Sequence, residues 1–473
     1  MSGYRPQRSY FAERAWLSGD AGMADDVTIN VVSGVIESVV VGEPAPSDAV
    51  RLPGFVMPGL VNAHSHAFHR ALRGRTHGGS GDFWSWREQM YTVARRLNPD
   101  SYFRLARAVY AEMALAGITT VCEFHYLHHD AEGVPYADPG VMPAALSRAA
   151  NEAGMFLVYL DTCYLTADVE GSPLSGPQRR FGDTDVERWL ERVEAVVNVR
   201  PGPGVFGAAI HSVRGCPPDA MRAVAEWARG RDAPLHIHLS EQLKENEACL
   251  AVHGRTPAAL CADTGVLGPR TTAVHATHLT YEDIRLLGDS ATIAGFCPTT
   301  ERDLADGIGP AAALRAAGSP LSLGSDSHAV IDLFEEARAV ELDERLATRR
   351  RGLHSAVDLL EAATEGGARS AGLEGRAGRI AEGLYADFIA VDTDSVRLAG
   401  AADPVAATVF AATATDVTHV VSGGDLIVEN GHHTLVPDVA RELETAISEL
   451  FEDLNSLSAA RQGLCAVACP LHT

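Results

Sequence analysis

Two histidines separated by a single residue, His64 and His66, stand at the end of an apolar run that begins at Val56. Side chains alternate between the two faces of a β-strand, so these imidazoles should project together from the end of a strand. Two neutral imidazoles that converge in this way can share one metal ion. An HxH pair alone is equally compatible with a structural role, so the metal interpretation depends on further ligands elsewhere in the chain.

Three later segments supply further ligand and acid–base candidates. His238 lies in the run LHIHLSE, with Glu241 three residues beyond it. A carboxylate in that place can take a proton from a metal-activated water and deliver it to a leaving group. His275 ends the apolar run TTAVH, and Asp326 follows the run LSLGS. We therefore expect one shared site for metal-assisted hydrolysis, with each candidate at the end of a different strand.

The types of the candidate ligands restrict the metal. Imidazole and carboxylate ligands with one open position are typical of catalytic Zn²⁺, which lowers the pKa of a bound water to about 7. Fe²⁺ and Mn²⁺ accept the same ligand types and stay open as alternatives. Asp326 should remain ionised beside the ion, because the metal is the largest local charge.

The segments that must position these residues alternate between short apolar runs and amphipathic helical stretches. Besides the strand before His64, seven strands are expected, at residues 119–125, 156–160, 205–210, 235–239, 271–275, 292–296 and 321–323. Helical stretches between and after them include residues 101–116, 141–153, 185–197, 218–229 and 332–349. Eight strands alternating with helices predict an α/β fold of the (β/α)₈ barrel type, in which catalytic residues lie at the C-terminal ends of the strands.

Both ends of the chain are rich in β-like runs instead. Residues 27–32 and 35–41 flank Ser33-Gly34, which is a tight-turn signal, and similar runs occur at 387–392 and 417–424. We expect residues 1–57 and 373–436 to pair into one small β-sandwich. It would flank a barrel formed by residues 58–372, and a C-terminal helix and tail would follow at 437–473.

Composition restricts the partners of the chain. The formal net charge of −23 would repel polyanions, so nucleic acid is not expected to bind. No apolar run is long enough to cross a membrane, and the N-terminal segment lacks the apolar core of a signal peptide. Eight cysteines without CxxC spacing are typical of reduced thiols. These features predict a cytoplasmic protein that acts on a small-molecule substrate, without a nucleic-acid or membrane partner.

Over about residues 16–430, the ordered motifs HxH, HLSE, VHATH and GSDSH resemble those of the amidohydrolase superfamily. The resemblance implies a distorted (β/α)₈, TIM-like barrel with a small flanking β-sandwich built from both chain ends. Some members hold two metals bridged by a carbamylated lysine. The only lysine here is Lys244, beyond the HLSE segment, so the resemblance is to the mononuclear deaminase branch.

The resemblance also assigns roles and assembly. It implies one Zn²⁺ per subunit and a homodimer. Glu241 would shuttle protons, His275 would orient the attacking hydroxide and polarise the reacting carbon, and Asp326 would also accept a proton from the water. The metal ligands carried over are His64, His66, His238 and Asp326.

Four loop segments narrow the resemblance to the formimidoylglutamate deiminase family of histidine degradation. These segments are AFHRALRG after the HxH pair, FWSWREQMY at 83–91, EFHYLHHD at 123–130 and IHSVR at 210–214. The implied substrate, N-formimino-L-glutamate, carries an amidine and two carboxylates, and Arg87 and Arg214 could each clamp one carboxylate bidentately. Tyr126 and His211 could add hydrogen bonds. His69, which stands where this family usually has glutamine, is also expected to contact the substrate.

Two other functions stay open. The same metal site would permit deamination of a ring amidine, as in guanine, cytosine or S-adenosylhomocysteine, although two arginines at the barrel mouth disfavour neutral bases. A non-catalytic scaffold with an amidohydrolase-like barrel would have lost its ligands, whereas every ligand and Glu241 are present here. A serine hydrolase is unsupported, because the sequence contains no GxSxG motif.

Overall fold

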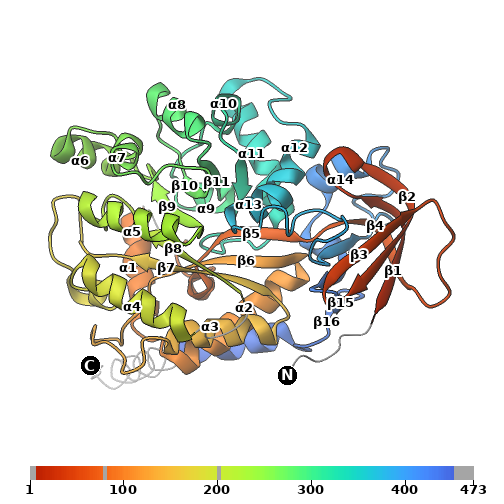
Figure 1. Ribbon diagram of the computed structural model, residues 1–473, viewed down its shortest axis with the longest axis horizontal. Coiled ribbons are helices and arrows are strands. Elements are labelled where there is room, and N and C mark those ends of the chain that lie inside the picture. The colour runs from red at the N-terminus through yellow and green to blue at the C-terminus, as the bar shows by residue number, and fades with distance from the viewer. Residues whose placement is uncertain (1–6, 78–82, 200–203, 452–473) are drawn as a thin grey trace, which may run out of the picture.

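The computed structural model describes residues 7–77, 83–199 and 204–451. Its main body is a parallel sheet of eight strands in sequence order (Figure 1). The strands are β5 (Leu60–Ser65), β6 (Ile118–His125), β7 (Phe156–Cys163), β8 (Val205–Ile210), β9 (Leu235–Leu239), β10 (Thr271–His275), β11 (Ile293–Phe296) and β12 (Leu321–Leu323). The predicted (β/α)₈ barrel is thereby confirmed.

The barrel closes where the ends of β12 and β5 meet. Ser65 forms a parallel bridge with Asp326. The Asp326 N–H donates to the His64 carbonyl at 3.0 Å, and the His66 N–H donates to the Asp326 carbonyl at 3.3 Å. A Cβ atom on Gly324 would lie 2.7 Å from the Cβ of His64, so only glycine permits this approach. Closure therefore brings the HxH segment against the last strand.

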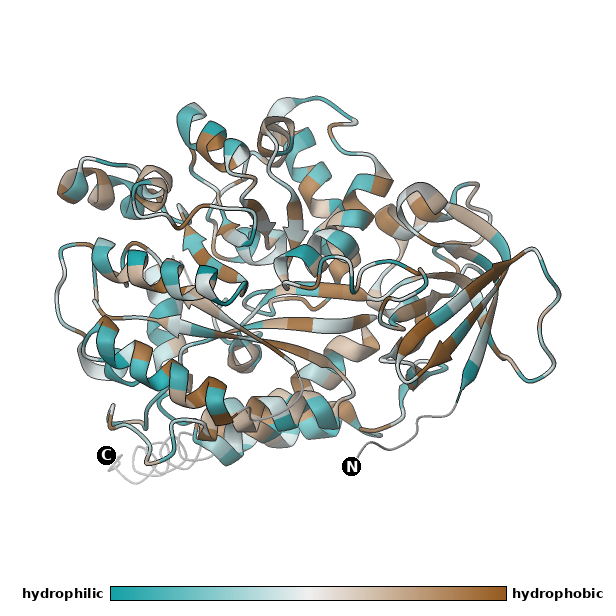
Figure 2. Cartoon of the chain, in the orientation of Figure 1, coloured by the Kyte–Doolittle hydropathy of each residue, from teal (hydrophilic) through white to brown (hydrophobic). Residues whose placement is uncertain are grey.

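Helices surround the barrel strands and bury one face each. In α4 (Val186–Val199) the buried residues Trp189, Val193 and Val196 recur at helical spacing. Hydrophobic residues dominate the strands, whereas the outer helices alternate between hydrophobic and hydrophilic positions (Figure 2). The other helices that follow barrel strands include α2 (Pro99–Leu115), α3 (Val141–Glu152), α5 (Pro218–Gly230), α6 (Leu243–His253), α7 (Pro257–Asp263), α8 (Tyr281–Asp289), α9 (Pro298–Asp303), α10 (Ala311–Ala317) and α11 (Leu333–Thr348).

Side-chain caps fix where several of these helices begin. The Asn98 side chain accepts from the Ser101 N–H at the start of α2, and Asp332 accepts from the Phe334 N–H at the start of α11. Such caps satisfy backbone donors that have no partner inside the helix. The helical stretches expected at 101–116 and 332–349 are thus confirmed to within two residues at either end.

The two ends of the chain form a second sheet beside the barrel. Its strand order is β16-β15-β14-β13-β4-β1-β2-β3. The antiparallel pair β4–β13 joins the N-terminal to the C-terminal half, with Pro58 opposite Phe388. The strands are β1 (Arg8–Trp16), β2 (Met23–Val32), β3 (Val35–Val41), β4 (Val50–Pro58), β13 (Phe388–Val391), β14 (Val417–Ser422), β15 (Asp425–Glu429) and β16 (His432–His433). The predicted pairing of the two β-rich ends is therefore confirmed, and the hydrogen-bonded ladder runs through all eight strands.

Residues 439–451 are helical and lie along α2. Arg104 pairs with Glu449 at 2.7 Å, and Arg107 pairs with Glu442. The rest of the expected C-terminal helix and tail, from residue 452 onward, lies outside the described residues. Among the helices that the structure describes, none combines the length and apolar character needed to cross a bilayer.

Candidate metal centre and active site

Four buried side chains from three strand ends converge at the C-terminal mouth of the barrel. The Nε2 atom of His238 lies 3.1 Å from that of His64 and 3.4 Å from that of His66. The Oδ1 atom of Asp326 lies 3.3 Å from His64 Nε2 and 3.4 Å from His66 Nε2. Ligands at about 2.0–2.1 Å from a tetrahedral ion would be separated by roughly 3.3 Å. Each of these four separations is close to that value, so His64 and His66 could bind one divalent metal together with His238 and with Asp326.

Backbone carbonyls set the orientation of two of these imidazoles. His66 Nδ1 lies 2.9 Å from the Phe124 carbonyl, and His238 Nδ1 lies 2.9 Å from the His211 carbonyl. A carbonyl only accepts, so Nδ1 carries the proton and Nε2 presents its lone pair to the centre of the cluster. Both rings are therefore pre-oriented as ligands.

Burial and neighbouring groups give the four side chains the protonation states that metal binding requires. Burial lowers the pKa of His64 to about 3 and lowers the pKa values of His66 and His238, so all three imidazoles are neutral. Burial alone would raise the pKa of Asp326, but the hydrogen bond from His64 and the surrounding imidazoles hold it well below its usual range. Neutral nitrogens with one carboxylate are the protonation states that bind a divalent cation.

The backbone around this cluster is strained. Ser240, His275, Asp326 and His328 all adopt positive φ, at 52°, 70°, 39° and 56° respectively. Such conformations cost of order 1 kcal/mol or more for residues other than glycine and persist where the surrounding structure enforces them. The strain gathers at the ends of β9, β10 and β12, where it aims the ligand-bearing loops into the barrel mouth.

A series of buried hydrogen bonds holds the segment that contains His64 and His66. Glu123, at the end of β6, accepts from the Ser65 hydroxyl at 2.8 Å and from the Ala67 N–H at 2.7 Å. Ser65 Oγ also lies 3.2 Å from His328 Nε2, and His328 Nδ1 lies 3.0 Å from Ser325 Oγ. Burial raises the pKa of Glu123 to about 7. The residues between and beside the ligands are thus held by both neighbouring strands.

Glu241 and His275 lie together beside the ligand cluster. Glu241 Oε1 is 3.9 Å from His275 Nε2, and His275 Nδ1 is 3.3 Å from Glu301 Oε1. Burial lowers the pKa of His275, but the hydrogen bond to Glu301 and the charges of Glu241 and Asp326 outweigh it and raise the pKa to about 10. The arrangement is a carboxylate next to an imidazolium that a second carboxylate orients, which suits proton transfer to and from a reacting group.

Replacing Glu301 with glutamine is expected to lower kcat by roughly 10- to 100-fold, because supporting partners of this kind contribute on that scale. The substitution keeps the shape of the side chain but removes the charge that raises the His275 pKa. The alkaline limb of the pH–rate profile should therefore move to lower pH. Steady-state kinetics across pH 5–10 would check this, and an unshifted limb would refute the positioning role of Glu301.

A cavity above the cluster contains all five residues expected to contact substrate. His69, Arg87, Tyr126, His211 and Arg214 line it together with Glu241, His275 and Asp326. His69 Nε2 is hydrogen-bonded to the Tyr126 hydroxyl at 3.0 Å. The Nε atom of Arg87, on α1 (Phe83–Ala94), is buried and has no hydrogen-bond partner among the described residues. Arg214 is already engaged, because its Nη2 lies 2.8 Å from Glu241 Oε2.

Two residues that sequence reasoning did not select also belong to this region. Tyr164, just beyond β7, lines the cavity, and Glu301, just beyond β11, holds His275. β7 and β11 are the two barrel strands for whose ends the sequence predicted no functional residue. The rule that barrel enzymes carry their active-site residues at the C-terminal ends of strands was the one available signal for them.

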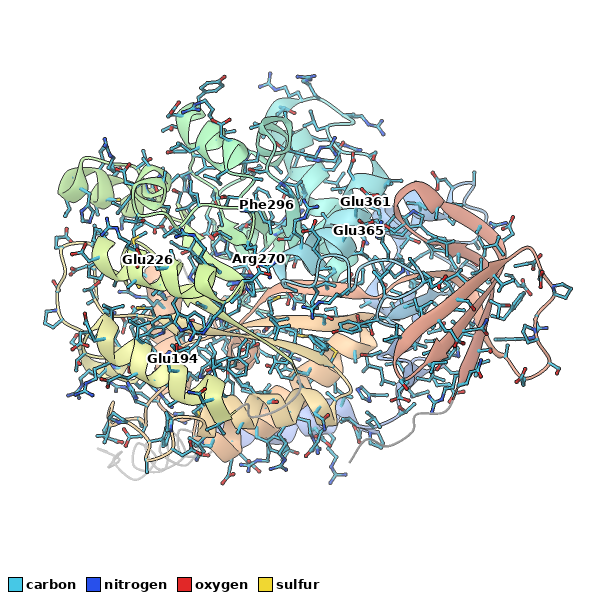
Figure 3. The ribbon with its side chains drawn as sticks, viewed as in Figure 1. Glu194, Glu226, Arg270, Phe296, Glu361 and Glu365 are labelled. Carbon is cyan, nitrogen blue, oxygen red and sulfur yellow. The ribbon has the colours of Figure 1, made fainter. Side chains whose placement is uncertain are left out.

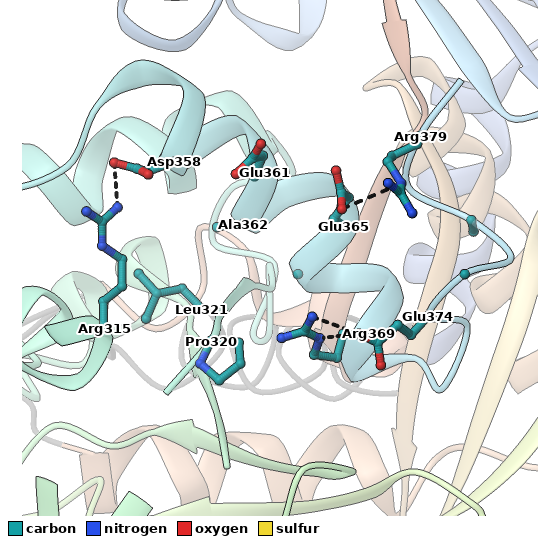
Figure 4. A pocket seen from close by; sticks show the side chains of 13 residues that line it. Arg315, Pro320, Leu321, Asp358, Glu361, Ala362, Glu365, Arg369, Glu374 and Arg379 are labelled. Atoms are coloured by element: carbon teal, nitrogen blue, oxygen red, sulfur yellow. Dashed lines mark hydrogen bonds and ion pairs between the residues drawn. The ribbon is translucent and has the colours of Figure 1, made fainter. Parts of the chain in front are cut away.

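A second cavity lies at the opposite end of the barrel, beside the start of β12 (Figure 4). Its arginines are paired, Arg315 with Asp358, Arg369 with Glu374 and Arg379 with Glu365. Figure 3 places Glu361 and Glu365 side by side on this face. Burial, followed by the charge of Glu365, raises the pKa of Glu361. Histidine and cysteine are absent from its lining, so the mouth of the barrel is the candidate active site.

Comparison with known proteins agrees with this geometry. A model of the amidohydrolase family matches residues 55–427. The chain is 36% identical over 456 residues to the formimidoylglutamate deiminase of Pseudomonas aeruginosa, which covers 93% of this chain and 99% of that protein. It is 32% identical over 394 residues to the 8-oxoguanine deaminase of the same species, covering 80% of this chain and 82% of that protein. The crystal structure of an amidohydrolase from Brucella melitensis matches with a TM-score of 0.87 at 34% identity, covering 94% of this chain and all of that one.

Proposed function

This chain belongs to the amidohydrolase family as a metal-dependent hydrolase, and we propose that it converts N-formimino-L-glutamate and water into N-formyl-L-glutamate and ammonia. The observation that carries the substrate is the pair of arginines, Arg87 and Arg214, in the cavity above the metal-ligand cluster. Two guanidinium groups suit a substrate with two carboxylates, whereas a neutral base offers neither of them an anionic partner. The 36% identity to a formimidoylglutamate deiminase supports the same choice.

The proposal includes the metal. His64, His66, His238 and Asp326 would hold one ion, for which we propose Zn²⁺, because imidazole and carboxylate ligands suit it and a water could occupy a fifth position. Bound there, the ion supplies a water of lowered pKa and polarises the reacting carbon. A role in histidine degradation, a cytoplasmic location and a homodimeric state belong to the same proposal, and light scattering would test the last of these.

The chain's own residues then move the protons. Glu241 takes a proton from the water as its oxygen bonds to the formimino carbon, and His275 donates a hydrogen bond to the developing charge. The formimino group enters protonated, as an amidinium, so its nitrogen already carries two hydrogens, and Glu241 returns its proton to that nitrogen, which departs as ammonia. As the formyl carbon–oxygen double bond forms, Asp326, ionised by its surroundings, accepts the second proton of the water and passes it to the departing ammonia, which leaves as ammonium.

An ammonia-release assay tests the function directly. The purified, zinc-loaded protein would be given N-formimino-L-glutamate, 8-oxoguanine, guanine, cytosine and S-adenosylhomocysteine in parallel. We expect kcat/KM for the first to exceed each of the others by at least about 1,000-fold, since none of the others offers a carboxylate to both arginines of the cavity. Higher kcat/KM for any of the ring compounds would refute the proposal and favour ring deamination.

Replacing Arg87 with alanine is expected to raise KM by roughly 30- to 100-fold while kcat changes less than about threefold, because a charge-assisted clamp on a remote group contributes to binding. The buried Nε atom of Arg87 has no hydrogen-bond partner among the described residues, so the substitution breaks no hydrogen bond within that part of the protein at this atom. The matched control is Arg95→Ala, an exposed arginine just beyond the same helix, which should leave KM unchanged. Equal KM values in the two variants would refute the clamp.

A further inference from the structure

The guanidinium of Arg214 holds the side chain that is assigned as proton shuttle. Arg214 Nη2 lies 2.8 Å from Glu241 Oε2, and both side chains are buried. Arg214 Nε also lies 3.3 Å from Ser212 Oγ and 3.8 Å from Glu245 Oε1. Burial alone would lower the pKa of Arg214, but the charges of Glu245 and Glu241 raise it, so the guanidinium remains charged. Glu241 is therefore one half of a buried ion pair.

This pairing conflicts with the work that Glu241 must do. The guanidinium of Arg214 occupies Oε2 of Glu241, while Oε1 faces His275 at 3.9 Å. Glu241 must accept a proton from water and then deliver it to the departing nitrogen, so its carboxyl group must be free to move between the two while the reaction proceeds. The ion pair has to loosen before the shuttle can operate.

A carboxylate of the substrate can weaken the ion pair between Arg214 and Glu241. Each carboxylate of the substrate adds a negative charge to a region that already contains the buried carboxyl groups of Glu241, Glu245 and Glu301. Arg214 is the guanidinium among them, while Arg87, on α1, lines the same cavity and its Nε has no hydrogen-bond partner among the residues that the structure describes. A carboxylate that reaches Arg214 must therefore compete with Glu241 for the same cation.

We propose that a carboxylate of the substrate displaces Glu241 from Arg214 and thereby frees it to act as proton shuttle. This inference rests on the proposed function and adds a specificity device to it. A molecule that has the amidine but lacks that carboxylate would bind in the site while Glu241 remained paired with Arg214. Discrimination would then appear in kcat as well as in KM, because the missing group is needed in the chemical step.

Two analogues that each lack one carboxylate test the inference on the unmodified zinc-loaded enzyme. N-formimino-4-aminobutyrate lacks the α-carboxylate, and N-formimino-L-2-aminobutyrate lacks the side-chain carboxylate. One of them, the analogue without the carboxylate that Arg214 takes, should show kcat at saturation lower by at least about 30-fold. The other, which lacks the Arg87 partner, should differ mainly in KM. Wild-type kcat at saturation with both analogues would overturn the inference.

Added carboxylate distinguishes displacement from mere orientation. Acetate at about 0.1 M should raise kcat of the slow analogue roughly tenfold if a free carboxylate can occupy Arg214 in place of the missing group. In Arg214→Ala, Glu241 has no partner to leave, so N-formimino-L-glutamate and the slow analogue should share one kcat. Arg87→Ala is the matched arginine variant, and there the difference in kcat should persist. A slow analogue that acetate does not rescue would overturn the inference.

A structural readout is independent of turnover. A crystal structure with the product N-formyl-L-glutamate should show Glu241 beyond hydrogen-bond distance of Arg214, with a product carboxylate on the guanidinium. An intact Arg214–Glu241 pair in that complex would refute displacement. Failure of the proposed function has a different signature, namely no ammonia release from N-formimino-L-glutamate itself.

Discussion

Replacing Glu241 with glutamine is expected to lower kcat by about three to four orders of magnitude, at the upper end of what general acid–base catalysis contributes. Glutamine has the size of glutamate and can still accept a hydrogen bond from Arg214, which lies 2.8 Å away. It cannot take a proton from water or return one to the leaving nitrogen. Metal content should be unchanged, because Glu241 is not among the four atoms that converge on the metal position.

Stopped-time ammonia assays with metal analysis on the same preparation would measure both quantities. Glu336→Gln is a matched control, because burial raises the pKa of Glu336 well above its usual range and its neutral carboxyl resembles an amide. A carboxyl oxygen of Glu336 accepts a hydrogen bond from the Thr299 N–H at 2.9 Å, and Glu336 does not line the active-site cavity. Its kcat should stay within about threefold of wild type, as for an isosteric change outside the reacting groups. Glu241→Gln with kcat in that same range would refute the shuttle role.

Replacing Asp326 with alanine is expected to remove both metal and activity. Asp326 is the one anionic member of a cluster whose three imidazoles are neutral, so its loss leaves a bound dication without a compensating charge. Breaking a buried charge pair costs about 3–5 kcal/mol, which corresponds to a loss of metal affinity of roughly 100- to 4,000-fold. Elemental analysis after dialysis against a weak chelator should find well under one equivalent of zinc.

Asp326→Asn separates charge from backbone strain. Asp326 adopts φ 39°, a conformation that asparagine tolerates better than alanine. Asparagine should therefore preserve the closure of β12 against β5, and thermal stability should fall less than in the alanine variant. Metal affinity should still fall, because the carboxylate charge is absent. Full zinc occupancy in either variant would contradict the assignment of Asp326 as a ligand.

Local sequence determined which residues could do chemistry and which elements carry them. The alternation of side chains along a strand places His64 beside His66, and it requires no knowledge of the rest of the chain. Apolar runs of strand length alternating with amphipathic stretches predicted the barrel, and the polar residues at the strand ends predicted its mouth. The resemblance of FWSWRE and EFHYLHHD to one deaminase family then pointed to the loops that line the cavity.

The pairing between distant segments was decided only by the tertiary structure. Local patterns specify neither how closely two strand ends approach nor which charges share a cavity, because both depend on how the barrel closes and on side-chain burial. Asp326 meets His64 because β12 closes against β5, and Glu301 reaches His275 from a strand end that carries no motif. Arg214 was predicted to bind substrate because its loop segment, IHSVR, resembles that of one deaminase family. Its contact with Glu241 depends on how two loops fold together. The folded loops bury the two opposite charges side by side, and buried charges are stabilised by pairing.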